Sequence, residues 1–210
     1  MSIYQMLLGD SFEKLHPKLQ ERYSFQRDGM FQGKGTMTDI QGGRRWMYPF
    51  LLLLTKWKFI FPESGKQIPF EIKNNAYRKP DGMEEVKWER TFHFQNVTRH
   101  FHAFMTIDST RKIVKDYLGE PSLFYSDLLF TVTPEGNLSI VSGSQKLVLG
   151  KVEIPIPSIL KGNVEVLEGF DDQVQAFTIE VKISNGLLGN VMSYKGYFVE
   201  VDNEKGKESE

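Results

Sequence analysis

Three histidines close together in the sequence are the candidates for metal binding. His93, His100 and His102 lie on alternate positions of two adjoining segments with strand-like alternation. A hairpin that turned at Asn96-Val97 would pair His93 with His100 and leave His102 on the same face. Three imidazoles could then bind zinc. Because a register shift of one residue would break this cluster, the interpretation we favour is solvated or core-rim histidines.

An arginine among aromatic residues is the second candidate. Arg90 follows Trp88 on the apolar face of the strand expected at 85–95. A buried guanidinium needs a carboxylate, carbonyl groups or an anionic ligand. We expect an ion pair with a residue such as Glu71 or Asp127, and the alternative is that Arg90 holds the polar end of an otherwise apolar ligand. The candidate ligand-binding residues are aromatic apart from this arginine: Trp46, Trp57, Trp88, Arg90, Phe92, Tyr194 and Tyr197.

No catalytic signature accompanies these residues. Gly33-Lys34-Gly35 is not followed by the downstream glycine and the Lys-Ser/Thr pair that a phosphate loop requires. Its glycines therefore indicate a bulge or a close backbone approach in a strand. The sequence also lacks the Gly-x-Ser-x-Gly elbow, the His-Glu-x-x-His helix and the dinucleotide fingerprint. We therefore assign no catalytic residue and no cofactor, and we expect that the protein is not an enzyme.

The composition is that of an ordinary globular protein. Of 210 residues, 40% are hydrophobic and 25% are charged, and the formal net charge of -1 gives no global field that would attract nucleic acid. The absence of cysteine excludes disulfides, thiolate catalysis and cysteine-bearing metal sites. No secretory signal is visible at the N-terminus, so we expect a cytoplasmic location.

The expected elements change type along the chain. A capping box at Ser2 and Gln5 with helical spacing of apolar residues predicts an N-terminal helix, and Pro17 begins a second. From Gln67 onward, two-residue alternation and turn signals predict successive strands, with one short helix at 111–118. Further pauses between strands are expected at 80–82, 134–137, 142–144, 169 and 185–186.

The most apolar segment, residues 44–61, is the least usual part of the sequence. Lys56 and Pro62 leave it short of the roughly 20 apolar residues that a transmembrane helix needs. We expect a helix from about Pro49 that packs against the sheet, and the alternative is insertion of Trp46–Phe61 into a membrane interface. Ile154–Leu160, with two prolines, resembles a lid or a rim.

Together these elements predict an α+β fold that is mainly antiparallel β. A curved sheet or open barrel would have helical cover from the N-terminal third of the chain. Residues 1–201 are expected to form a single globular domain. The charged tail at 202–210 carries no apolar anchor, so we expect it to be disordered.

Short motifs spread over most of the chain occur in a shared order. They are Leu7-Leu8-Gly9 with Phe12 and Leu15, Gly33-Lys34-Gly35, Phe61-Pro62, Ile68-Pro69, Trp88 with Glu89-Arg90-Thr91-Phe92, Gly119, Gly136-Asn137-Leu138 and Tyr194-Lys195-Gly196-Tyr197. In these the chain resembles the bacterial domain-of-unknown-function family DUF4166, which occurs alone in bacilli, fused to membrane proteins and appended to saccharopine-dehydrogenase-like proteins. The resemblance implies domain boundaries, and no activity or catalytic residue follows from it.

A surplus of aromatic residues without a catalytic signature predicts a binding domain. The chain has 16 Phe and 3 Trp, which suit a pocket for an apolar or lipid-like small molecule. One alternative is a membrane-surface or protein-interaction domain that uses the 46–61 or 154–160 segment. Another is an enzyme that acts on an apolar substrate through Arg90 and the histidines. The expected partners are an apolar small molecule and a peripheral membrane contact, with no nucleic acid.

Overall fold

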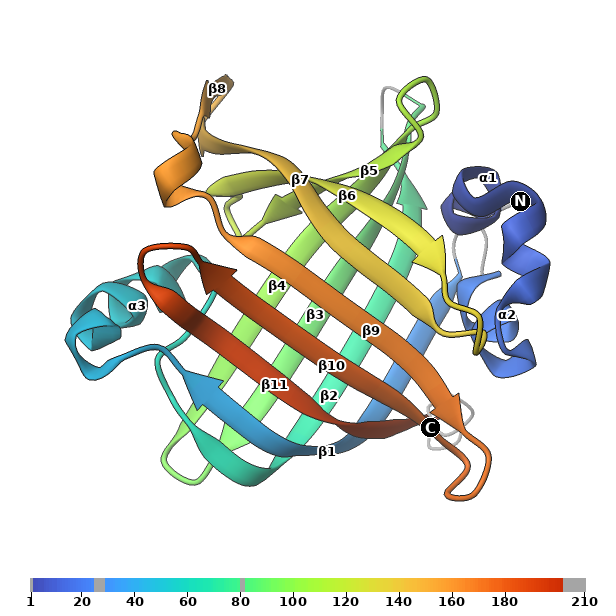
Figure 1. The fold of residues 1–210 in the computed structure, drawn as a ribbon, viewed down its shortest axis with the longest axis horizontal. Coiled ribbons are helices and arrows are strands. Elements are labelled where there is room, and N and C mark those ends of the chain that lie inside the picture. Colours follow the sequence, from blue (N-terminus) through green and yellow to red (C-terminus); the bar gives the residue numbers. More distant parts are fainter. Residues whose placement is uncertain (1, 25–28, 80–81, 202–210) are drawn as a thin grey trace, which may run out of the picture.

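One antiparallel sheet that closes into a barrel dominates the computed structural model, which describes residues 2–24, 29–79 and 82–201. The strands of the described residues are β1 (Met30–Gly42), β2 (Gly65–Arg78), β3 (Glu84–Phe94), β4 (Val97–Asp108), β5 (Ile113–Leu118), β6 (Phe124–Val132), β7 (Leu138–Leu149), β8 (Val152–Pro155), β9 (Asn163–Asp171), β10 (Ala176–Asn185) and β11 (Gly189–Glu200). Ten of them form a ring, because β1 pairs with β11 and β6 pairs with β7 (Figure 1). β8 pairs with β7 alone and lies outside the ring.

The barrel has a simple meander topology. Each strand of the ring is antiparallel to both neighbours, and chain order is followed around the ring apart from the β8 excursion between β7 and β9. The expected α+β fold with mainly antiparallel strands is confirmed. The barrel is closed rather than open, because closure gives every edge strand a hydrogen-bonding partner.

Two short α-helices joined by a 3-10 helix cover one end of the barrel (Figure 1). They are α1 (Ile3–Leu8), the 3-10 helix Gly9–Lys14 and α2 (Pro17–Tyr23). The expected capping box is present: Ser2 Oγ accepts from the Gln5 amide at 3.2 Å, and Gln5 Oε1 accepts from the Ser2 amide at 2.8 Å. Ser2 Oγ also donates to the carbonyl of Tyr23 at 2.6 Å, which ties the start of α1 to the end of α2.

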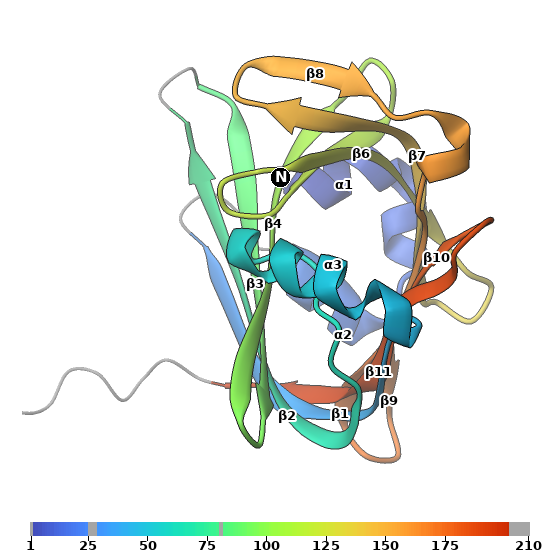
Figure 2. The same cartoon turned by 90° about the vertical axis from the view of Figure 1, so that its left-hand side faces the viewer.

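The apolar 44–61 segment covers the opposite end of the barrel (Figure 2). It forms a 3-10 turn (Arg45–Met47), α3 (Tyr48–Leu54) and a second 3-10 turn (Thr55–Trp57). Met47, Leu51 and Leu54 are buried, so the predicted helix against the sheet is confirmed. Among the described residues, no helix has the length and apolar character needed to cross a membrane.

The Gly33-Lys34-Gly35 motif lies where β1 and β11 approach closely. A Cβ on Gly35 would lie 2.0 Å from the carbonyl oxygen of Tyr197, and one on Gly196 would lie 2.2 Å from that of Thr36. β1 also carries a bulge within this pairing. The glycines therefore serve backbone geometry, as the sequence predicts.

Some expected elements are wrong. The short helix predicted at 111–118 is β5, because hydrogen bonds to β4 and β6 on both sides outweigh local preference. The break predicted at 142–144 lies inside the continuous strand β7. The tail expected to be disordered, 202–210, lies outside the described residues.

Candidate functional site

Arg90 lies in the middle of the barrel interior. Its side chain is 7% exposed, its Nε donates to the carbonyl of Phe101 at 3.2 Å and its Nη1 donates to the hydroxyl of Tyr194 at 3.2 Å. The guanidinium carbon lies 3.9 Å from the centroid of the Phe101 ring and 5.9 Å from that of Trp88. In the described part of the chain no carboxylate oxygen lies within 4.0 Å of this guanidinium. Among the described residues, Arg90 is therefore a buried cation without an ion pair.

The carboxylates expected to pair with Arg90 are engaged elsewhere. Glu71 lies on the outer face of β2, 3.3 Å from Lys34 Nζ, and Asp127 pairs with Arg111 and Tyr125. The predicted ion pair is wrong, because Glu71 alternates with the inward positions of its strand and because Asp127 has nearer partners.

A second titratable group, Asp116, shares the interior with Arg90. It lies on β5 and is 4% exposed, and its Oδ1 has no hydrogen-bond partner among the described residues. Burial raises the pKa of this carboxyl to about 7, although the positive charge of Arg90 acts in the opposite direction. The carboxyl is therefore partly protonated near neutral pH.

An aromatic layer lies between Arg90 and the α3 end of the barrel. The Phe92 ring lies 5.2 Å from Tyr194 and 4.9 Å from Phe61, and Phe59 lies 5.8 Å from Phe101 (centroid distances). All five side chains are buried. The interior beyond Arg90 toward α3 is thus apolar.

A polar layer lies on the other side of Arg90, toward α1 and α2. Arg22 Nη1 donates to Glu168 Oε2 at 2.6 Å, and Tyr23 donates to the same oxygen at 2.5 Å. Trp88 Nε1 donates to the Tyr4 hydroxyl at 2.9 Å. This layer ties the helical cover to the barrel wall.

The structure brings four of the seven predicted ligand-binding residues together. Trp88, Arg90, Phe92 and Tyr194 line the same interior. The other three are elsewhere: Trp46 and Tyr197 are exposed, and Trp57 is partly buried against the edge of the core. The sequence reasoning missed Arg22, Glu168 and Asp116.

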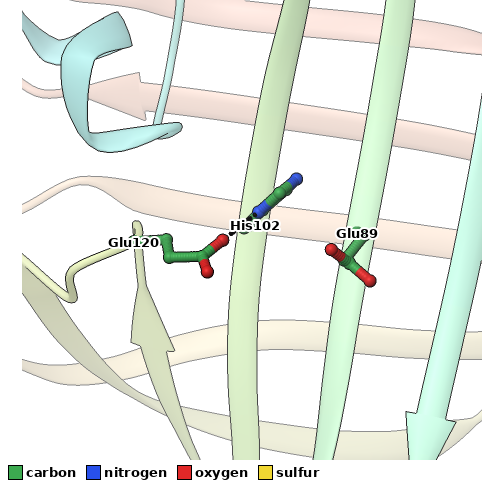
Figure 3. A group of neighbouring side chains, drawn as sticks. All are labelled: Glu89, His102 and Glu120. Carbon is green, nitrogen blue, oxygen red and sulfur yellow. Dashed lines mark hydrogen bonds and ion pairs between the residues drawn. The ribbon is translucent and has the colours of Figure 1, made fainter.

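A separate cluster of ionisable groups lies on the outer face of β3 and β4. Glu89, His102 and Glu120 each place one potential ligand atom within 4.8 Å of the others. Figure 3 shows His102 between the two glutamates. Backbone hydrogen bonds position the cluster, because the His102 amide donates to the carbonyl of Lys58 at 2.9 Å and the Glu120 amide donates to that of Trp57 at 2.7 Å.

The charges of this outer cluster are already balanced. His102 Nδ1 hydrogen-bonds Glu120 at 2.8 Å, Lys58 Nζ lies 3.0 Å from Glu120, and Lys87 Nζ lies 3.0 Å from Glu89 and 3.5 Å from Glu120. The hydrogen bond from His102 and that from Lys58 lower the pKa of Glu120 to about 2. Burial lowers the pKa of His102 below its ordinary value, which favours the neutral imidazole.

The predicted three-histidine cluster does not form among the described residues. The hairpin turns one residue earlier than expected, at Gln95-Asn96, so His93 faces Thr98 and His100 faces Thr91. The histidines still share the outer face, and the His100 and His102 rings lie 5.5 Å apart. His93 lies 3.8 Å from Glu71. Only His102 belongs to the group with metal-ligand spacing.

A shallow depression of about 180 Å³ adjoins the outer cluster. It is lined by side chains from β2, β3 and β4: Glu71, Lys73, Glu89, Thr91, His100 and His102. Two carboxylates, one ammonium, one hydroxyl and two imidazoles line its wall, so it offers donors and acceptors without one dominant sign of charge. This favours an ion-pair network over an anion or cation receptor.

Fold and interior together define a ten-stranded antiparallel barrel with charged groups buried among aromatic rings. The chain belongs to the family of the domain of unknown function DUF4166, whose model matches residues 15–198. It is 38% identical over 203 residues to "Uncharacterized protein YndH" of Bacillus subtilis (strain 168), covering 97% of this chain and 98% of that protein. The family resemblance drawn from the short motifs is confirmed.

Proposed function

We propose that the barrel binds an amphipathic small molecule, lipid-like in having an apolar body and one anionic end. The anionic group would pair with Arg90, and the apolar body would lie in the aromatic layer toward α3. The observation that carries this proposal is the buried guanidinium without a carboxylate partner among the described residues. A charge removed from water is expensive unless it is paired, so a resident anion would offset that cost.

Tyr194 supports the same assignment. Its hydroxyl accepts from Arg90 at 3.2 Å, and it donates no hydrogen bond within the described residues. A carboxylate beside Arg90 could therefore accept from both the guanidinium and this hydroxyl. Two donors converging in an apolar surrounding are typical of a binding site for one polar group.

The width of the barrel is the second support. Side chains alone can fill an eight-stranded barrel, and the diameter grows with the number of strands. The ring here has ten. Barrels of this kind commonly enclose ligands. For the compartment we propose the cytoplasm, with which a chain lacking cysteine is compatible.

Catalysis has less support. The imidazole of His102 and the carboxylates of Glu89 and Glu120 are held by one another and by Lys58 and Lys87. None of these groups faces the barrel interior where an apolar substrate would lie.

Tryptophan fluorescence tests the proposed function. A W46F/W57F background leaves Trp88 as the reporter near Arg90, and dodecanoate and dodecanol serve as matched probes. We expect saturable binding of dodecanoate at least about tenfold tighter than that of dodecanol, because a hydrogen bond to a charged group contributes roughly 1.5–3 kcal/mol.

Variants in that background identify the contact. R90M should reduce the preference for dodecanoate to about the level of dodecanol. R78M, which removes an arginine that is 45% exposed and faces Glu84, should leave it unchanged. Equal affinities for the two probes in the parent protein, or an undiminished preference in R90M, would overturn the proposal. Native mass spectrometry of freshly purified protein provides a separate check for a co-purifying acid.

A further inference from the structure

Large apolar side chains project into solvent at the α3 end of the barrel. They come from three loops, and we call them the apolar rim: Trp46 (63% exposed), Phe50 (58%), Ile159 (61%), Leu160 (61%) and Leu187 (67%). Tyr48, Leu52 and Leu53 of α3 are also exposed beside them. Several exposed apolar residues of this size on neighbouring loops indicate an interaction surface.

The three loops are neighbours in space. Asn185 Nδ2 donates to the carbonyls of Ile159 and Lys161 at 2.9 and 2.7 Å, which joins the β10–β11 turn to the segment before β9. The Arg44 guanidinium lies beside Gly189, which joins the same turn to the segment that carries α3. Figure 2 shows these parts at one end of the barrel. The three segments that carry the rim therefore adjoin one another.

Folding of the α3 segment does not depend on its outer side chains. Three of its own side chains, Met47, Leu51 and Leu54, are buried and anchor the segment to the core. Trp46 and Phe50 belong to the same segment but remain exposed. Their apolar area is thus available to a partner.

The segment that carries α3 is positively charged. Residues 40–62 contain four cations, at 44, 45, 56 and 58, and no acidic residue, whereas the whole chain has a net charge of -1. Arg44, Arg45 and Lys56 are exposed. Lys58 pairs with Glu120 at 3.0 Å, and Glu153 of the β7–β8 hairpin pairs with Lys146 at 2.7 Å. The rim therefore complements a negatively charged surface.

We propose that the apolar rim docks on an anionic lipid bilayer. Trp46, Phe50 and Leu187 enter the interfacial region, and Arg44, Arg45 and Lys56 lie beside the lipid phosphates. Apolar burial and electrostatic attraction act together at such interfaces, and tryptophan is well suited to the boundary between headgroups and acyl chains. A bilayer suits these exposed side chains better than a protein partner, because it needs no shape complementarity. The docked face is the end of the barrel nearest the aromatic layer.

Vesicle co-sedimentation tests this proposal on the full chain. Vesicles of phosphatidylcholine are compared with vesicles of phosphatidylcholine mixed with phosphatidylglycerol. We expect partitioning onto the mixed vesicles at least about tenfold stronger, with a decline as salt is added. W46A/F50A and R44E/R45E should each reduce partitioning by about tenfold or more.

Matched controls lie at the opposite end of the barrel. V174A removes an exposed apolar side chain (64% exposed) from the β9–β10 turn, and K112E reverses an exposed charge between β4 and β5. Both should partition like the unmodified protein. In a W57F/W88F background, the Trp46 emission should shift to shorter wavelength on the mixed vesicles.

Three results would overturn the docking proposal. One is equal partitioning onto both kinds of vesicle, and another is unchanged partitioning of W46A/F50A. The third is self-association in solution that W46A/F50A abolishes, without vesicle binding, which would assign the rim to a second copy of the chain. R90M should still bind vesicles, so failure of the proposed ligand site and failure of the rim are distinguishable.

Discussion

The guanidinium of Arg22 and the carboxylate of Glu168 lie 2.6 Å apart inside the barrel, although 146 residues separate them in the sequence. Both side chains are 1% exposed. The Arg22 guanidinium also lies 4.7 Å from the ring centroid of Phe31 and 4.8 Å from that of Phe198. This pair joins helix α2 to strand β9, so it fixes the helical cover on the barrel.

We expect R22M to destabilise the protein strongly. Methionine fills much of the same space, but it leaves the Glu168 carboxylate buried without its cation, which costs about 3–5 kcal/mol. The double variant R22M/E168L, which removes both charges, should recover much of this loss. The measurement is the free energy of unfolding in urea. K18M is the control, because the Lys18–Glu21 pair on the same helix is exposed and contributes little. A loss below about 1 kcal/mol in R22M would contradict the expectation.

R90M should behave in the opposite way. Arg90 has no ion pair among the described residues, so replacing it leaves no buried carboxylate within bonding distance unpaired. Replacement of a buried charge by an apolar side chain of similar volume is often neutral or stabilising. Below pH 7, where the Asp116 carboxyl keeps its proton, we expect an unfolding free energy equal to or above that of the parent, together with the loss of dodecanoate preference. Destabilisation by more than about 2 kcal/mol would mean that Arg90 is retained for structure, not for a ligand.

Much of the barrel could be predicted from the sequence because each strand keeps its two-residue period. In β3, Trp88, Arg90 and Phe92 share one face by spacing alone, and the structure buries all three in the interior. Closure of the ring could not be predicted, because it depends on pairing between residues of β1 and β11 that are at least 150 positions apart in the sequence. Sequence periodicity carries no information about such long-range pairing.

For two of the missed polar groups, the sequence does contain a signal, which is the two-residue alternation of a strand. Glu168 continues the inward alternation of Val164 and Val166, and Asp116 continues that of Val114. Reading 111–118 as a helix concealed the position of Asp116. The partner of Arg22 could not be predicted from the sequence. The helical period of α2 indicates the face on which Arg22 lies, but it does not identify the residue that this face contacts.

Stability should fall as the pH rises from about 4 to about 7, because of Asp116. Burial raises the pKa of its carboxyl to about 7, above the value of about 3.9 in an unfolded chain. Between these values the folded protein keeps a proton that the unfolded chain has lost, so the free energy of unfolding decreases with pH by up to about 4 kcal/mol in total. Above about pH 7 this contribution is constant.

D116N removes the titration while it keeps the shape of the side chain. We expect a flatter dependence of unfolding free energy on pH between 4 and 7 and a more stable protein at pH 7, measured by urea unfolding at several pH values. In R90M the fall should extend to higher pH, because the charge of Arg90 lowers the pKa of Asp116. A slope in D116N equal to that of the parent would show that another group causes the dependence.

The outer cluster of Glu89, His102 and Glu120 should bind zinc weakly as long as its lysines remain. The ammonium groups of Lys58 and Lys87 lie 3.0 Å from Glu120 and Glu89, respectively, and neutralise the two carboxylates. A divalent cation would have to displace both. We therefore expect K58M/K87M to bind Zn²⁺ at least about tenfold more tightly than the parent in isothermal titration, since a neutral imidazole and two free carboxylates are suitable ligands.

Two further variants in the K58M/K87M background would locate the ion. E89Q should reverse the gain, because it removes one of the three ligands with metal spacing. H93Q should not, because His93 lies beside Glu71 and outside that group. Tight zinc binding by the parent protein itself would show that attraction to the two glutamates outweighs the lysines, and the cluster would then be a metal site and not an ion-pair network.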